Sequence, residues 1–273
     1  MPAIAAPLVP IDAARRLLLD GYALDRVPPT ATPAQVLATV RHLGFVQVDS
    51  INSVERAHHL ILHSRLDAYQ PAHLAHHTER TRQLFEHWTH DASIIRSDWL
   101  PWWVHRFASE RARFAGSIAK DKRIGRDWRR IVADVRGALE SRGPLTTRDF
   151  PRPQRASAGW WDWSPHKVAL ERLWRTGEVA IHARRGFDKV YDLAHRVYGS
   201  LPEHGPQSEL VAWACREALA RLGAATPREI AHFLWAITPT EATEWCSRAA
   251  ERGEVVPVRL ERRGRDQIGR AHV

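Results

Sequence analysis

The chain has 273 residues, of which 44% are hydrophobic and 26% are charged, with a formal net charge of +9. This composition excludes a chain that is disordered for lack of apolar residues. No run approaches the roughly 20 apolar residues that cross a bilayer, and no basic region precedes the apolar N-terminal residues, so we expect neither a membrane protein nor a secreted one. The positive charge favours a polyanionic partner, usually nucleic acid.

The balance between arginine and lysine has two explanations. Only four of the 40 basic residues are lysines. An arginine guanidinium is a planar fork that suits phosphate groups and guanine edges, whereas a GC-rich genome enriches arginine without a functional cause. We attribute most of the high ratio of arginine to lysine to a GC-rich genome. The expectation of a nucleic-acid partner rests on the net positive charge.

The cysteines and histidines do not predict a metal or a disulfide framework. The chain has two cysteines, Cys215 and Cys246, which are too few for a disulfide framework and are not spaced as in a zinc knuckle. We expect them to be reduced, packed thiols of a cytoplasmic protein. The 16 histidines lack acidic partners at ligand spacing, so we assign most of them to the surface or to packing and expect no metal and no cofactor.

The first part of the chain predicts helices with one short strand. Its expected elements, in order, are a helix over 12–20, a helix over 33–43 opened by Thr32-Pro33 and ended by Gly44, a strand over 44–50, a helix over 72–84, an extended or irregular stretch over 88–96, and a helix over 100–119.

The second part contains an internal repeat. Aligned from Gly143 and Gly223, both copies read Gly-x-x-Thr-x-Arg-acidic-apolar, and each follows a helical segment. A further helix ending in Gly-Glu-Val and a β-like stretch come next in both copies. The threonines, Thr146 and Thr226, are suited to cap a short second helix. Helix, turn, short helix, third helix and hairpin is the order of a winged helix-turn-helix.

The repeat predicts a mainly helical α+β chain of tandem winged-helix modules. We expect four segments: a first module with additional helices at 1–119, a second at 120–200, a third at 201–265 and a tail at 266–273. A winged helix binds DNA in many proteins and serves as a protein-interaction module in others, so the fold does not by itself specify the function.

Two basic stretches are candidate DNA contacts. Arg184 and Arg185 lie at the tip of the hairpin in the second module, where they suit a phosphate backbone or a minor groove. The stretch 120–130 is the densest in basic residues, and its candidates are Lys120, Lys122, Arg123 and Arg126. A solvated turn and a soluble linker explain the two stretches equally simply. For the tryptophans at 160–163, burial is a better explanation than base stacking.

The strand over 44–50 carries the only pattern that suggests chemistry. Alternate residues of a strand share a face, so Gln47 and Asp49 should project together, opposite Val46 and Val48. A carboxylate can take a proton from a water molecule that a neighbouring amide holds. Asp-Ser-x-Asn is also a turn sequence, so Asp49 has the alternative role of capping the following turn.

The segment from Gln47, QVDSINSVERAHHLILHSRL, resembles the AlkZ/YcaQ family of winged-helix DNA glycosylases. The stretch FEHWTHDASIIRSDW and the hairpin GFDKVYDLAHRV resemble the same family, and the resemblance runs over about residues 12–260. It implies tandem winged helices around a basic DNA channel and a small C-terminal β-barrel. The catalytic motif that it implies is Gln-apolar-Asp, here Gln47 and Asp49, and Arg56 and His90 fall on motif positions that we take as candidate DNA contacts.

The resemblance further implies an enzyme that hydrolyses the N-glycosidic bond of N7-alkylated purines, and of crosslinks, in double-stranded DNA. No lysine lies near Gln47 and Asp49 in the sequence, so we expect a monofunctional enzyme without a Schiff-base lyase step. We expect a monomer in the bacterial cytoplasm. The chain ends before the implied barrel, and residues 268–273 resemble a sequencing-library adapter, so we expect a gene fragment with a non-native tail. The alternative function is a non-catalytic tandem winged-helix DNA-binding protein, such as a transcriptional regulator, or a protein-interaction scaffold.

Overall fold

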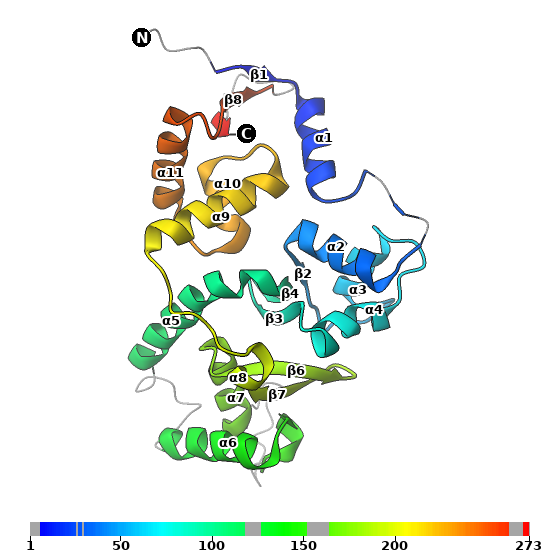
Figure 1. Cartoon of the computed structure of the whole chain (residues 1–273), viewed down its shortest axis with the longest axis vertical. Helices are drawn as coiled ribbons and strands as arrows, with labels where there is room; N and C mark the ends of the chain where they lie inside the picture. The colour runs from blue at the N-terminus through cyan, green and yellow to red at the C-terminus, as the bar shows by residue number, and fades with distance from the viewer. Residues whose placement is uncertain are drawn as a thin grey trace. The chain divides into compact units, whose positions relative to one another are not determined.

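The computed structural model describes residues 6–25, 27–28, 30–117, 127–151, 164–261 and 270–272 (Figure 1). The longer helices are α1 (Ile11–Gly21), α2 (Pro33–Leu43), α3 (Ala57–His63), α5 (Leu100–Ser117), α6 (Trp128–Arg142), α7 (Pro165–Arg175), α9 (Gln207–Leu222), α10 (Pro227–Leu234) and α11 (Pro239–Glu251). The short ones are α4 (Pro71–Ala75), α8 (Ala194–Tyr198), a π-helix (His76–Arg80) and 3-10 turns at Ser97–Trp99 and Thr147–Asp149. The strands are β1 (Leu8–Val9), β2 (Phe45–Gln47), β3 (Leu84–Trp88), β4 (Ala92–Arg96), β5 (Leu145–Thr146), β6 (Val179–Arg185), β7 (Asp188–Leu193), β8 (Pro257–Leu260) and β9 (Arg270–His272).

The chain forms two compact units. Unit 1 contains residues 1–71, 89–91 and 205–273, and unit 2 contains residues 72–88 and 92–204. The expected α+β class is confirmed, because helices dominate and the strands form small sheets. The division into modules at 1–119, 120–200, 201–265 and 266–273 stays a prediction.

Unit 1 is built on helices with a small edge sheet. Helix α9 contacts α1, α10 and α11, and α2 and α3 contact β2. Strand β8 pairs in parallel with β1 and antiparallel with β9. Thus residues 270–272 of the expected tail form a strand, although this pairing says nothing about the origin of the tail. Cys215 on α9 and Cys246 on α11 are buried free thiols, as expected, and burial raises the pKa of both, that of Cys215 to about 12.

Glycine allows the closest approach between α1 and α9. A Cβ atom added to Gly21 would lie 2.0 Å from the backbone oxygen of Arg221, a distance that real Cβ atoms do not reach. The same helix approaches Gly223, where an added Cβ would lie 2.7 Å from the Cβ of Leu17. The packing of α1 therefore depends on two positions without side chains.

A Gly21→Ala substitution should lower the free energy of unfolding by about 1–3 kcal/mol, because the backbone of α9 must move to admit the methyl group. Gly137→Ala is the matched control. It lies on the exposed face of α6 with nothing within 4 Å of an added Cβ, and should raise that free energy by about 0.5–1 kcal/mol. Denaturant unfolding of both variants measures the difference, and equal effects would contradict the close-contact explanation.

The expected threonine caps are confirmed in both repeats. Oγ1 of Thr226 accepts a hydrogen bond from the Glu229 amide at 3.3 Å, and Oε2 of Glu229 accepts from the Thr226 amide at 2.8 Å. Thr146 and Asp149 form the equivalent capping box. Each box satisfies amides that a helix start leaves unpaired. This role accounts for the threonine, followed three residues later by an acid, that both copies of the repeat contain.

Unit 2 contains the hairpin that the sequence predicts after the second helix-turn-helix. Strands β6 and β7 pair antiparallel from Val179↔Leu193 to Arg185↔Asp188, and β5 pairs with β7 on its other edge. Helices α6 and α7 contact each other and enclose a core with Trp174 and Leu139, both fully buried. The order α6, turn, α7 and hairpin is the one that the sequence predicts, and the assignment of this module as a winged helix stays a prediction.

The prediction of a helix over 72–84 is wrong for the last part of this range. Helix α4 and the π-helix occupy residues 71–80, but Leu84 already begins β3. The stretch expected to be extended, 88–96, contains the turn and second strand of the β3–β4 hairpin. Residues Leu84, Phe85, Ile94 and Ile95 are all buried, so the hairpin carries apolar side chains on both faces and lacks the alternation that signals a half-exposed strand.

A fully buried histidine joins two tryptophans in unit 2. His87 Nδ1 accepts a hydrogen bond from Trp103 Nε1 at 3.0 Å, which leaves its Nε2–H to donate to the Trp174 carbonyl, also at 3.0 Å. Both bonds are satisfied by neutral imidazole. Burial lowers the pKa of His87 to about 3, more than its hydrogen bond to the Trp174 carbonyl raises it.

Acid should therefore weaken the fold through His87. In the unfolded chain this histidine takes up a proton near pH 6.5, whereas in the folded chain it does so only near pH 3. Between these values the unfolded state binds more protons, so the free energy of unfolding falls as the pH is lowered from 6.5 toward 3. His87→Gln removes this titration, and its unfolding free energy should depend less steeply on pH in that window. Parallel pH profiles for the two proteins would contradict the assignment.

Candidate active site

The expected catalytic pair lies on the solvent side of an extended segment in unit 1. Val46 and Val48 are only 2% and 4% exposed, whereas Gln47 is exposed and Asp49 is half-buried. Regular strand geometry ends at Gln47, but the alternation continues through Asp49. Burial of the two valines thus turns the amide and the carboxylate outward together.

Asp49 also caps the following turn. Its Oδ1 accepts a hydrogen bond from the backbone amide of Ile51 at 2.9 Å, which is the turn contact that Asp-Ser-x-Asn favours. Within the described residues this is the one hydrogen bond of the carboxylate. The bond restrains the orientation of the carboxylate and leaves Oδ2 able to accept a proton or a hydrogen bond from water. The capping role and a catalytic role are therefore compatible.

His90 contacts the beginning of β2, the strand that leads to the expected catalytic pair. Its ring centroid lies 6.0 Å from that of Phe45, the first residue of β2, and Phe45 in turn lies 5.6 Å from Phe233. His90 Nε2 donates to the carbonyl of His232 at 2.5 Å, so this nitrogen carries a proton. His90 is exposed, and its contacts fix its ring beside β2. A role in DNA contact stays a prediction.

Arg56 is placed at the start of α3, on the far side of the turn that follows Asp49. It is half-buried, and its backbone amide donates to Glu55 Oε1 at 2.8 Å. Its predicted DNA contact is not tested by these interactions. Among the described residues, no cluster of three or more His, Cys, Asp or Glu side chains is arranged to hold a metal ion.

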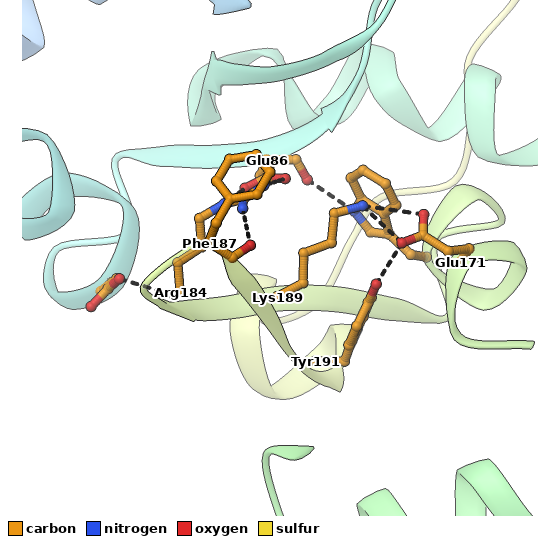
Figure 2. Close-up of polar contacts among 8 residues, drawn as sticks. Glu86, Glu171, Arg184, Phe187, Lys189 and Tyr191 are labelled. Atoms are coloured by element: carbon orange, nitrogen blue, oxygen red, sulfur yellow. Dashed lines mark hydrogen bonds and ion pairs between the residues drawn. The ribbon is translucent and has the colours of Figure 1, made fainter. Parts of the chain in front are cut away.

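The hairpin tip of unit 2 presents only one of its two expected arginines to solvent. Arg185 is exposed. Arg184 instead turns back to Glu86 on β3, and its Nε and Nη2 donate to the two carboxylate oxygens at 2.8 and 2.6 Å (Figure 2). Its Nη1 donates to the Phe187 carbonyl at 2.7 Å. These contacts indicate a structural role for Arg184, and the predicted DNA contact rests on Arg185.

A second acid, Glu171, whose side chain is 14% exposed, contacts two further residues of the hairpin. Glu171 on α7 accepts a hydrogen bond from Tyr191 at 2.6 Å and from Lys189 Nζ at 2.9 Å (Figure 2). The Lys189 ammonium also lies 3.8 Å from the centroid of the Trp174 ring, a cation–π contact. Burial raises the pKa of Tyr191, and the nearby carboxylate of Glu171 raises it further, so Tyr191 stays protonated and donates. The network holds two hairpin side chains, those of Lys189 and Tyr191, against α7.

Removal of one partner of the Glu86–Arg184 pair should destabilise unit 2. Burial alone lowers the pKa of Arg184, but the charge and hydrogen bonds of Glu86 outweigh it and raise that pKa. Glu86→Gln leaves the guanidinium without its counter-charge, and unfolding should become easier by about 3 kcal/mol.

Asp188→Asn is the matched control for Glu86→Gln. Asp188 lies on the same hairpin, and the substitution removes its ion pair with Arg148. The side chains of Asp188 and Arg148 are 41% and 69% exposed. Its effect should be below about 1 kcal/mol, because water screens an exposed pair. Chemical denaturation of the two variants makes the comparison, and an equally small effect of Glu86→Gln would refute the role assigned to Arg184.

Two groups of expected residues lie outside the described parts of the chain. They are the basic candidates Lys120, Lys122, Arg123 and Arg126, and the tryptophans at 160, 161 and 163. Their predicted roles are therefore not tested. The described residues contain no helix that is long and apolar enough to span a membrane.

The class of the protein is a DNA glycosylase, an enzyme that hydrolyses N-glycosidic bonds, because a family model described as DNA glycosylase AlkZ-like matches residues 40–272. This match spans most of the 273 residues, and the chain belongs to the AlkZ-like DNA glycosylase family. Membership decides between the two expected functions in favour of the enzyme and implies a DNA substrate.

A solved structure supports the fold independently. The Streptomyces sahachiroi DNA glycosylase AlkZ is similar with a TM-score of 0.60 over 95% of this chain and 68% of that chain. The two sequences are 16% identical, so this similarity concerns the fold. The resemblance inferred from the Gln47 segment is confirmed at the level of the family.

Proposed function

We propose that this DNA glycosylase releases N7-alkylated purines from double-stranded DNA, with Gln47 and Asp49 as its catalytic residues. The observation that carries the proposal is the outward placement of both side chains beside the buried Val46 and Val48. An amide and a carboxylate on one solvent-facing segment can hold and activate a water molecule. The Gln-apolar-Asp resemblance supports the same pair, and purine crosslinks are a second proposed substrate class.

The chemistry that this pair would perform is limited to hydrolysis. Alkylation at N7 makes the purine cationic, so the glycosidic bond is weakened before the enzyme acts. Asp49 would accept a proton from the attacking water and stabilise positive charge on the sugar, and Gln47 would orient that water. The Ile51 amide would keep one carboxylate oxygen in place during the reaction.

The distribution of lysines supports a monofunctional mechanism. A glycosylase that also cleaves the strand through a Schiff base needs an amine such as lysine. The four lysines of the sequence are Lys120, Lys122, Lys167 and Lys189, and none of them lies near the Gln47–Asp49 motif in the sequence. Attack by water, without a Schiff base, is consistent with this distribution.

Asp49→Asn should lower the release of 7-methylguanine from methylated duplex DNA by about a hundredfold or more, since it removes the general base. Affinity for undamaged DNA should stay within about twofold, because the substitution alters one half-buried side chain. Chromatography of the released base measures the rate, and fluorescence anisotropy measures the affinity.

Glu244→Gln is the matched control for Asp49→Asn. It makes the same acid-to-amide change at an exposed position of α11 in unit 1, where the carboxylate pairs only loosely with Arg248 at 4.0 Å. This variant should release base at the wild-type rate. If Asp49→Asn also released base at that rate, Asp49 would have no part in the mechanism, and a wild-type protein inactive on methylated DNA would refute the proposed substrate.

A further inference from the structure

Trp235 has a backbone conformation that its side chain disfavours. It ends α10 with φ 53° and ψ 33°, the left-handed region, where glycine is the usual residue. A bulky residue there is an outlier, and such strain concentrates at functional positions. The conformation is anchored locally, since the Trp235 amide donates to the Ala231 carbonyl at 3.2 Å.

The side chain gains little burial in return for this strain. Trp235 is 61% exposed, although Phe233 and Leu234 beside it are 8% and 2% exposed. Of the other tryptophans in the described residues, Trp99, Trp103 and Trp174 are almost completely enclosed. More than half of the surface of Trp235 therefore stays accessible in the folded chain, where a ligand can cover it.

The surroundings of Trp235 match a nucleic acid. Arg228 and His232 lie one turn apart on the exposed face of α10, and the ring of His232 lies 6.4 Å from that of Trp235, edge to face. No carboxylate of the described residues pairs with Arg228, and Glu229 beside it is held by the capping box with Thr226. A cation and an aromatic ring on one face are the groups that bind a phosphate and stack on a base.

A chain of ring contacts connects Trp235 to the catalytic strand within unit 1. The ring of His90 lies 5.2 Å from that of Trp235, edge to face, and 6.0 Å from that of Phe45. His90 is also hydrogen-bonded to the carbonyl of His232 on α10. The exposed indole is thus held beside the strand that carries Gln47.

We propose that Trp235 is a nucleobase-stacking residue that binds DNA next to the catalytic pair and covers a base exposed where the duplex is disrupted. The location of the catalytic pair rests on the proposed function, but the stacking itself does not require base release. A stacking residue prefers DNA in which a base face is accessible, because an intact duplex has already stacked its bases.

The test compares two labelled duplexes, one intact and one with a tetrahydrofuran abasic-site analogue, in anisotropy titrations at constant salt. Trp235→Gly should weaken binding to the abasic duplex by about tenfold or more and binding to the intact duplex by less than about twofold. Trp235→Phe keeps an aromatic face and should retain most of the affinity. Single-stranded DNA should respond as the abasic duplex does.

The fold should tolerate these changes. Glycine relieves the positive φ, so Trp235→Gly should unfold at or above the wild-type temperature, and Trp235→Asn provides a second variant that accepts this conformation. Ala68→Gly is the matched control, since Ala68 has φ 57° on an exposed turn of unit 1 and carries no ring. It should leave binding to both duplexes unchanged.

Two outcomes would overturn the proposal. One is wild-type affinity of Trp235→Gly for the abasic duplex, and the other is an equal loss on both duplexes, which indicates a general DNA contact without stacking. The assays also separate this proposal from the proposed function. A wild-type protein that released no 7-methylguanine, yet lost abasic-duplex affinity on Trp235→Gly, would refute the lesion assignment alone.

Discussion

The burial of Val46 and Val48 is the constraint on which the proposed site depends. Hydrophobic burial encloses these two side chains in a segment that begins with β2, which contacts α2 and α3, and the alternation of an extended backbone then places Gln47 and Asp49 on the opposite side. The polar pair needs no loop of its own to reach solvent. Its position is fixed by the same packing that holds unit 1 together, so the geometry is in place before any substrate binds.

The turn after the strand adds a second restraint. Asp49 is both the proposed base and the cap of the turn that begins at Ile51, so one side chain connects the core strand to the exposed loop. A carboxylate that is already hydrogen-bonded loses less freedom when it binds water, which favours a defined orientation during reaction. The capping role that the sequence suggested as an alternative for Asp49 is therefore compatible with its proposed catalytic role, because the cap holds the carboxylate in place.

Buried charge has a different role in unit 2. The Glu86–Arg184 and Glu171–Lys189 pairs link the β6–β7 hairpin to β3 and to α7, and their side chains are between 5% and 18% exposed. Buried ion pairs stabilise a fold weakly compared with apolar contacts, but they penalise any arrangement that separates the partners. They would therefore fix where the hairpin lies, and so direct the exposed Arg185 at its tip, more than they add stability.

The sequence by itself determined the α+β class, most of the helices, the two threonine caps, the strand with its outward amide and carboxylate, and the glycosylase family. These features follow from local rules: periodicity, capping chemistry and the alternation of a strand act over a few residues. The β3–β4 hairpin escaped this reasoning because its strands bury both faces and show no alternation. Only the tertiary structure decided that Arg184 pairs with Glu86, 98 residues away in the chain, and that Trp235 stays exposed while most tryptophans of the described residues are buried. The reason is physical: whether a charge meets its partner, or a ring meets a core, depends on segments that only the fold brings together.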